Sequence, residues 1–281
     1  MRPPFGGRTT RRPDYTEDGK PMQIGFLVTN RQQLEESADW DFDYLEGSPG
    51  LLGIDADNPR AVEREFLALL AKHPLQMKTM CGFVGDPQGR GLMVVGPDVS
   101  LERLRAFVTR VFDLMQRAGV EVIGYGSGGS RWVPDGFDRD KARQQVADFL
   151  HLCADLGEPR GVKVALEPYN RDDANLLNTV SEATEFIADV NRSHAKLMAD
   201  FFHMKLNGES FDALKEAGPH LIHAHIAEPG RGRPQTTPAD HALFLHTLRA
   251  SGYDGRVTLS GALPVYADDG EIAIALKKAI A

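Results

Sequence analysis

Three side chains that can bind a metal ion follow one another along the chain, each near the end of a short apolar run. Glu167 and Asp200 directly follow two consecutive runs, and His225 lies near the end of the next one. Two carboxylates and an imidazole are ligands that suit Mn²⁺, Co²⁺, Fe²⁺, Mg²⁺ or Zn²⁺. Carboxylates forced together in a partly dry site would raise the pKa of one of them, unless a cation lies between them. If the three runs are neighbouring strands, we predict one divalent metal ion on Glu167, Asp200 and His225.

Each of these residues also has an ordinary structural interpretation. A carboxylate or a histidine at a strand end often caps a helix or forms a salt bridge, and for one residue taken alone that interpretation is favoured. The joint pattern favours a shared site, although the spacing does not name the chemistry. Glu46 occupies the same kind of position after an earlier apolar run, 42–45.

The elements that would position these side chains alternate regularly. Short apolar runs predict strands at 24–28, 42–45, 77–84, 120–125, 162–166, 195–199, 221–226 and 257–259. Longer amphipathic segments predict helices at 31–38, 59–72, 101–118, 139–156, 181–190, 211–217, 240–250 and 269–280. Ser181 is the predicted N-cap of the fifth helix. Strands that alternate with helices pair in parallel, because each helix crosses back over the sheet. Eight such units predict a closed α/β fold, the (β/α)8 TIM barrel.

The predicted barrel forms a single catalytic domain, 23–281, preceded by a polar N-terminal arm, 1–22, that is rich in arginine and proline. The main rival fold is an open doubly wound sheet, which favours a glycine-rich phosphate turn after its first strand. Residues 29–31 contain no glycine, and the glycine-rich loop 124–130 lacks the lysine of a P-loop. The barrel is therefore favoured, with its active site where the strands end at their carboxyl side.

The two-residue period of a strand also predicts what lies beneath the mouth of the barrel. Counting back two residues from each predicted ligand gives Ala165, Met198 and His223. Small or apolar residues at the first two positions fit a packed barrel interior. The third is expected to be a hydrogen-bonded core histidine.

Composition excludes several classes of partner. The 281 residues carry a net charge of −8, which makes a nucleic acid an unfavourable partner. No stretch approaches the roughly 20 apolar residues of a membrane-spanning helix. The two cysteines, Cys81 and Cys153, are far apart in sequence, which suits a reducing cytoplasm better than a disulfide framework. The expected protein is cytoplasmic, takes a small-molecule substrate and is compatible with a homo-oligomer.

Six motifs are distributed over nearly the whole predicted barrel: Asp43-Tyr44-Leu45-Glu46, Gly124 to Arg131, Ala165 to Arg171, Leu176 to Thr179, Asp200 to Met204, and His223 to Ala227 with Arg231. Together they resemble the xylose isomerase-like sugar phosphate isomerases and epimerases. The resemblance is strongest to the ketose 3-epimerase and hydroxypyruvate isomerase branches. No single motif is specific, but the combination is.

The resemblance implies that Glu167, Asp200 and His225 are ligands of one divalent metal ion, with Mn²⁺ as the first choice. It also implies that Glu167 is the catalytic base. In that chemistry the metal acts as a Lewis acid on a carbonyl and a neighbouring hydroxyl. A carboxylate removes the proton beside the carbonyl to give an enediolate, and returning the proton elsewhere yields an isomer or an epimer.

Substrate contacts at the mouth are implied for Glu46, as a pocket wall residue, and for His203, Arg231 and Asp173. The epimerases usually carry glutamate at the position of Asp173. Trp132 follows the glycine-rich loop and would stack on a sugar ring, although packing on the surface is an equal alternative.

One position departs from the family pattern. The family places a glutamate, its fourth metal ligand and second base, at the end of strand eight, where this chain has Ser260. A serine hydroxyl is a poor base and a poor ligand for a divalent ion. The first expectation is therefore a metal-dependent isomerase or epimerase of a ketose or keto-polyol with Glu167 as base. A metal-dependent dehydratase or lyase resembling the inosose dehydratases is the alternative, and a non-catalytic barrel is the third interpretation.

Overall fold

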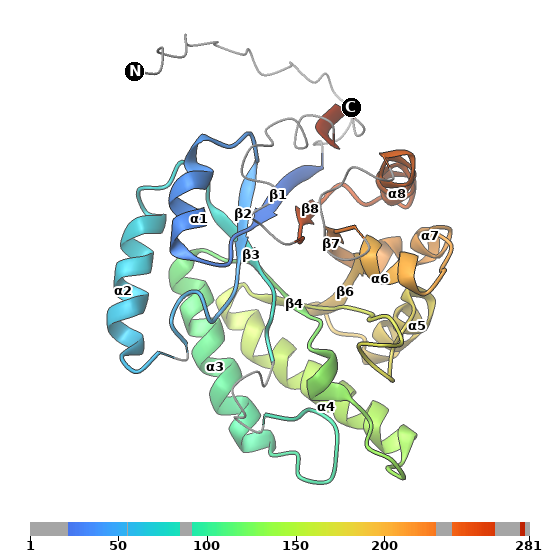
Figure 1. Ribbon diagram of the computed structural model, residues 1–281. Helices are drawn as coiled ribbons and strands as arrows, with labels where there is room; N and C mark the ends of the chain where they lie inside the picture. Colours follow the sequence, from blue (N-terminus) through green and yellow to red (C-terminus); the bar gives the residue numbers. More distant parts are fainter. Residues whose placement is uncertain (1–21, 55, 85–91, 229–237, 262–275, 279–281) are drawn as a thin grey trace, which may run out of the picture.

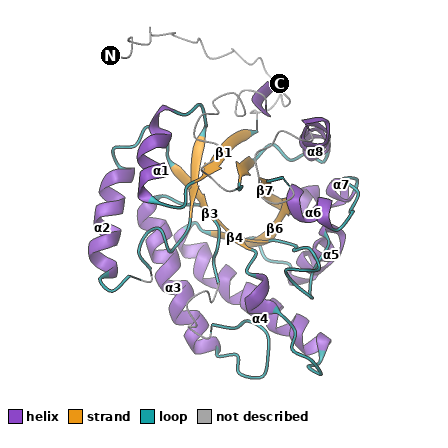
Figure 2. Ribbon diagram, in the orientation of Figure 1, coloured by secondary structure: helices purple, strands orange, loops and turns teal. Residues whose placement is uncertain are grey.

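Eight parallel strands close into a barrel in the computed structural model, which describes residues 22–54, 56–84, 92–228, 238–261 and 276–278. Each strand pairs with the next in sequence, and β1 pairs with β8 to complete the circle. Figure 2 shows the strands gathered at the centre with helices around them. The predicted TIM barrel is confirmed. Residues 1–21 of the predicted N-terminal arm, 1–22, lie outside the described residues.

The strands are short and begin and end close to the predicted bounds (Figure 1). They are β1 (Gln23–Leu27), β2 (Tyr44–Gly47), β3 (Met77–Met80), β4 (Val122–Tyr125), β5 (Lys163–Leu166), β6 (Ala195–Asp200), β7 (Leu221–Ile226) and β8 (Arg256–Leu259). The helices are α1 (Arg31–Glu36), α2 (Pro59–Leu70), α3 (Leu101–Ala118), α4 (Arg139–Gly157), α5 (Val180–Val190), α6 (Phe201–Leu206), α7 (Ala213–Ala217) and α8 (Pro238–Ala250). The last predicted helix, 269–280, lies outside the described residues except for 276–278.

Local capping explains why the helices begin and end where they do. The Ser100 side chain accepts from the backbone N–H of Arg103 at the start of α3, and Gly119 ends that helix with φ at 73°. A positive φ at a helix end favours glycine, because other residues would strain there. The predicted N-cap Ser181 is wrong: Thr179 caps α5, so the helix begins at Val180.

Two strand predictions were displaced, and one helix was missed. β2 begins and ends two residues later than predicted, so Glu46 lies inside the strand and not after it. β3 is shorter than predicted because the chain leaves the sheet before Gly82, whose φ is +68°. The short α6 was not predicted; it follows β6 directly, with Asp200 as its N-cap.

The apolar core has two parts. The large part lies between the strands and the surrounding helices, where Phe83 stacks on Phe112 with ring centroids 5.5 Å apart. The small part consists of Val122, Ala165 and Met198. Ala165 and Met198 are two of the residues that the strand period places inside the barrel, so they support the predicted inward face.

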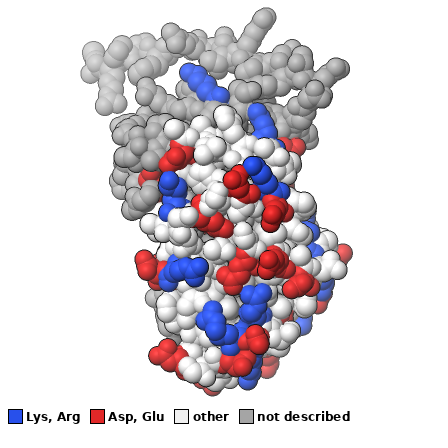
Figure 3. Space-filling view, turned by 90° about the vertical axis from the view of Figure 1, so that its right-hand side faces the viewer, with Lys and Arg blue, Asp and Glu red and all other residues white. Residues whose placement is uncertain are grey.

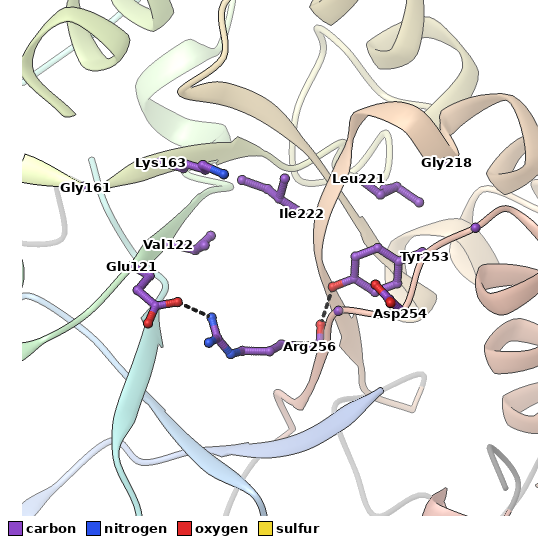
Figure 4. A pocket seen from close by; sticks show the side chains of 12 residues that line it. Glu121, Val122, Gly161, Lys163, Gly218, Leu221, Ile222, Tyr253, Asp254 and Arg256 are labelled. Atoms are coloured by element: carbon purple, nitrogen blue, oxygen red, sulfur yellow. Dashed lines mark hydrogen bonds and ion pairs between the residues drawn. The ribbon is translucent and has the colours of Figure 1, made fainter. Parts of the chain in front are cut away.

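A cavity of about 460 Å³ lies at the amino ends of the strands, opposite to the mouth. Figure 4 shows Arg256 pointing across it toward Glu121, and the two side chains form an ion pair at 2.9 Å. Lys78 contacts the same Glu121 carboxylate at 2.9 Å. The Lys78 pair joins the neighbouring strands β3 and β4, and the Arg256 pair crosses the barrel from β8 to the residue before β4, so this end of the barrel has a structural role.

Positive and negative side chains are interspersed over the α5 to α8 side of the molecule (Figure 3). Lys205 on α6, for example, pairs with Asp240 on α8 at 2.8 Å. Within the described part of this face, the view shows no broad area of one sign. None of the described helices has the length and the apolar character that a membrane-spanning helix needs.

Candidate metal centre

The carboxyl ends of β5, β6 and β7 bring three buried side chains together. Asp200 pairs in register with His225, and Glu167 directly follows β5. His225 Nδ1 lies 3.7 Å from Glu167 Oε1 and 3.8 Å from Asp200 Oδ2. These separations exceed hydrogen-bonding distance. They match the spacing of roughly 3–4 Å expected between ligands that each lie about 2.1 Å from one cation.

A fourth group, the His203 imidazole on α6, faces the same point. Its Nε2 lies 3.9 Å from Glu167 Oε1 and 3.9 Å from Asp200 Oδ2. Glu167, Asp200 and His203 form one cluster with metal-ligand spacing, and the distances of His225 to the same two carboxylates are as short, so distance alone allows either histidine to complete the site. The hydrogen bonds at the far side of each ring distinguish them, because those bonds fix which nitrogen carries the proton.

The Nδ1 atom of His203 is a hydrogen-bond acceptor. The backbone N–H of Asn170 donates to it at 3.1 Å, and the Asn170 amide nitrogen lies 2.9 Å away. A neutral ring with Nδ1 accepting carries its proton on Nε2, which faces the site. His203 is therefore suited to donating a hydrogen bond there and not to binding a cation.

His225 has the opposite arrangement. Its Nε2 lies 2.7 Å from Glu46 Oε1, and an ionised carboxylate can only accept, so Nε2 carries the proton. The Nδ1 atom then faces Glu167 and Asp200. Burial alone would lower the pKa of His225, but the negative charges of Glu46 and Glu167 outweigh it and raise that pKa well above its usual range. Without a cation the ring therefore carries a proton on Nδ1 as well, and a metal ion bound between the two carboxylates would take the place of that proton.

The two carboxyl oxygens of Asp200 have different roles, one in capping a helix and the other in the site. Oδ1 accepts from the backbone N–H of Phe202 at 2.8 Å and caps α6. Oδ2 points toward Glu167, His203 and His225. The cap fixes the rotation of the carboxyl group, so its second oxygen is held in place before any ligand binds.

Glu167 is held from behind by a buried cation. One Arg131 nitrogen donates to the Glu167 backbone carbonyl at 2.5 Å, and the Arg131 side chain is completely buried. Burial raises the pKa of the Glu167 carboxyl, but His225 and His203 outweigh it and lower the pKa to about 2. Glu167 is therefore ionised at neutral pH, as both a metal ligand and a base must be.

The donor set fits a divalent cation of the harder type. Two carboxylate oxygens and one imidazole lone pair converge, and their rear contacts fix the orientation of each. The second cluster of buried ligand types, Glu46, His223 and His225, does not fit in the same way. Its nitrogen–oxygen separations are 2.6 and 2.7 Å, which are hydrogen bonds and shorter than ligands around one ion approach each other.

The structure locates the other predicted residues at different depths. Glu46 is completely buried inside the barrel, where its carboxylate contacts two histidines and two threonines. Asp173 lies at the rim, half exposed, and accepts from the Asn170 side chain at 2.7 Å. Trp132 is 42% exposed. Arg231 lies outside the described residues.

Ser260 follows β8 and faces the mouth. Its backbone N–H donates to Ile226, and two residues earlier Thr258 contacts Glu46 inside the barrel. The strand period therefore directs Ser260 inward as well. Its hydroxyl is buried and has no hydrogen-bond partner among the described residues.

Sequence reasoning missed the contacts of four contributors to this centre. Arg131 was seen only as part of a loop motif, and buried arginines are too rare to be expected. Asn170, Thr79 and Thr258 were not assigned contacts, because they reach the site residues through folded geometry alone. The one available signal for Asn170 was its place in the motif Ala165 to Arg171, three residues after Glu167.

A Gly126→Ala change is expected to displace Glu167, because an added Cβ would overlap Glu167 Oε2 and the Tyr169 hydroxyl. A base moved by about 1 Å can lose roughly 100-fold in rate. The measurement is metal affinity together with proton exchange into substrate. Gly129→Ala in the same loop is the matched control, because its Cβ would meet nothing within 4 Å. Equal behaviour of the two variants would argue against close packing around Glu167.

The sequence matches the family model described as "Xylose isomerase-like TIM barrel" over residues 34–268. It is 34% identical over 124 residues to a 3-dehydro-D-guloside 4-epimerase from Escherichia coli, covering 43% of this chain and 47% of that protein. It is 33% identical over 164 residues to a D-psicose 3-epimerase from Agrobacterium fabrum, covering 55% of each. The chain thus aligns with about half the length of these curated relatives.

Solved structures extend the similarity in fold to most of the chain. A 3-keto-D-glucoside 4-epimerase from E. coli has a TM-score of 0.72 at 24% identity, covering 92% of this chain and 98% of that one. A D-psicose 3-epimerase from Clostridium cellulolyticum, solved with D-tagatose, has a TM-score of 0.72 at 22% identity, covering 92% and 96%. At these identities the similarity establishes the barrel fold.

Proposed function

Since this chain belongs to the xylose isomerase-like TIM barrel family, we propose that it is a sugar epimerase or isomerase that depends on one divalent metal ion. The proposed ligands are Glu167, Asp200 and His225, with Mn²⁺ as the first candidate and Co²⁺, Mg²⁺, Fe²⁺ or Zn²⁺ as alternatives. The observation that carries the proposal is the convergence of these groups at 3.7 and 3.8 Å, with His225 Nδ1 directed toward both carboxylates.

The proposed substrate class is an α-hydroxy ketone of a sugar or polyol. Psicose is a 2-ketose, so a 3-epimerase inverts the carbon beside the carbonyl. A 4-epimerase acting on a 3-dehydro sugar does the same. A proton on such a carbon is acidic because its conjugate base is stabilised as an enediolate. The relatives' names therefore point to one kind of chemistry, although they differ in the sugar.

The residues of this chain divide the work of moving that proton. The metal ion, when bound, supplies Lewis acidity at the carbonyl and hydroxyl oxygens. Ionised Glu167 removes the proton from the carbon beside the carbonyl through its carboxylate. His203 donates from Nε2 to a substrate oxygen, because its Nδ1 accepts from Asn170. Asp173 and Trp132 are proposed contacts at the rim, together with Arg231.

A metal-dependent dehydratase or lyase is the second candidate, and Ser260 is the observation that favours it. Inversion by two bases needs a proton acceptor and donor on each face of the enediolate, whereas elimination needs one base beside the carbonyl. Ser260 offers a neutral hydroxyl where the family places a carboxylate. The dehydration product would contain a conjugated carbonyl that absorbs in the near ultraviolet, and an epimer would not.

The direct test combines elemental analysis of the purified protein with proton exchange in D₂O. The substrates are D-psicose, D-fructose, D-tagatose, L-ribulose and a 3-keto-glucoside. We expect one divalent ion per chain and deuterium at the carbon beside the carbonyl, lost on chelation. A metal-free protein that also leaves every candidate unlabelled would support the non-catalytic interpretation.

Ser260→Glu is expected to tighten metal binding by on the order of 10-fold, because it adds an anionic oxygen at an inward-facing position. Ser260→Gln is the matched control, since it adds the same bulk without the charge. Affinity is measured by competition with a fluorescent chelator. If Ser260→Glu and Ser260→Gln bind the metal equally well, the end of β8 does not face the metal.

A further inference from the structure

Glu46 is an ionisable side chain at the centre of the barrel, with no exposed surface at all. Its Oε1 lies 2.7 Å from His225 Nε2, and its Oε2 lies 2.6 Å from His223 Nε2. Thr79 and Thr258 donate hydroxyl protons to Oε2 at 2.5 and 2.9 Å. Four groups from three other strands thus meet on one carboxylate.

The direction of every hydrogen bond in this cluster is fixed. An ionised carboxylate only accepts, so both histidines and both threonines must donate to Glu46. Thr258 has used its proton, so the 2.6 Å contact between Tyr44 and Thr258 has the Tyr44 hydroxyl as donor. The Nδ1 of His223 has no hydrogen-bond partner among the described residues, which agrees with a neutral ring protonated on Nε2.

We infer that Glu46 is a positioning residue that holds the His225 ring with Nε2 protonated and its Nδ1 lone pair turned to the metal centre. This inference rests on the proposed metal site but not on the identity of the sugar. Both carboxylate oxygens of Glu46 are completely buried and accept hydrogen bonds from side chains inside the barrel. Glu46 therefore contacts no substrate. A carboxylate behind a metal-binding imidazole fixes the tautomer and the orientation of the ring and makes Nδ1 more basic.

A carboxylate is required at this position, because only a carboxylate can accept from all four donors. A glutamine has one accepting oxygen and an NH₂ group. If its oxygen faces His225, its NH₂ group opposes the donors His223, Thr79 and Thr258. If its oxygen faces those three donors, its NH₂ group opposes His225 Nε2, and the favoured His225 tautomer becomes the one protonated on Nδ1.

The test is Glu46→Gln, measured by Mn²⁺ competition with a chelator on folded protein. We expect affinity to fall by about 10- to 100-fold, the usual effect of losing such a partner. Glu121→Gln is the matched control, because Glu121 is an ion-paired carboxylate at the opposite end of the barrel. Unchanged affinity in Glu46→Gln would overturn the inference and leave the metal site itself intact.

Nuclear magnetic resonance of the metal-free wild-type protein keeps the inference testable if Glu46→Gln does not fold. Long-range ¹H–¹⁵N spectra of labelled histidine report which ring nitrogens carry protons. We expect protonated Nε2 in both His223 and His225. A His225 ring with a bare Nε2 would overturn the inference. A wild-type protein that shows protonated Nε2 but binds no Mn²⁺ would instead refute the proposed metal site.

Discussion

Asp200→Asn is expected to abolish metal retention while leaving the fold intact, with affinity lowered by at least about 100-fold. An asparagine oxygen still accepts from the Phe202 N–H, and asparagine is as good an N-cap as aspartate. The second carboxyl oxygen, however, becomes an NH₂ group, which offers no lone pair to a cation. The change therefore separates the two functions of this side chain.

The measurement is metal content after purification and dialysis, with thermal unfolding to confirm the fold. Asp138→Asn is the matched control, because Asp138 caps α4 through an equivalent contact to Lys141 and lies on the surface. A fully loaded Asp200→Asn protein would show that the metal is bound elsewhere or that Asp200 is only a cap.

Glu167→Gln is expected to stop proton exchange at the carbon beside the carbonyl. Removing a general base typically lowers the rate by roughly 10²- to 10⁴-fold, and the amide is isosteric, so the mouth keeps its shape. Saturating metal concentration compensates for the weakened cation site and isolates the loss of the base. The measurement is the rate of deuterium incorporation from D₂O.

Glu121→Gln again provides the control, because it makes the same chemical change outside the mouth. Its exchange rate should equal that of the wild type. If the exchange rate of Glu167→Gln at saturating metal is within about 10-fold of the wild-type rate, another group takes the proton. The catalytic base would then be a residue other than the one that follows β5.

The sequence predicted the barrel well because its local signals agree with one another. α3 has apolar side chains at helical spacing, a serine at its start and a glycine at its end, and its bounds are those expected. The meeting of Glu167, Asp200 and His225 followed from one rule, that parallel strands end together at one side of a barrel. Their proximity therefore needed no knowledge of packing.

Depth within the barrel could not be predicted in the same way. The strand period directs Glu46 inward, but its height depends on the register between strands. That register shifts between Leu45 and Glu46 where β2 pairs with β3. Glu46 contacts both His223 and His225 inside the barrel, so a residue expected at the pocket wall lies behind a predicted ligand.

Side chains that act through others also escaped sequence reasoning. The dual use of Asp200 as cap and predicted ligand was hidden, because α6 begins with apolar Phe201 and Phe202 and has no separate capping residue. Arg131 is completely buried, and its contact with the Glu167 carbonyl joins two strand-end loops. Such contacts depend on three-dimensional packing that no local pattern encodes.

Anomalous diffraction from crystals grown with Mn²⁺ is the most direct test of the proposed metal site. We expect one strong peak bounded by Glu167 Oε1, Asp200 Oδ2 and His225 Nδ1, with His203 Nε2 outside its coordination shell. A peak that includes His203 and excludes His225, or no peak at the ends of β5, β6 and β7, would contradict it.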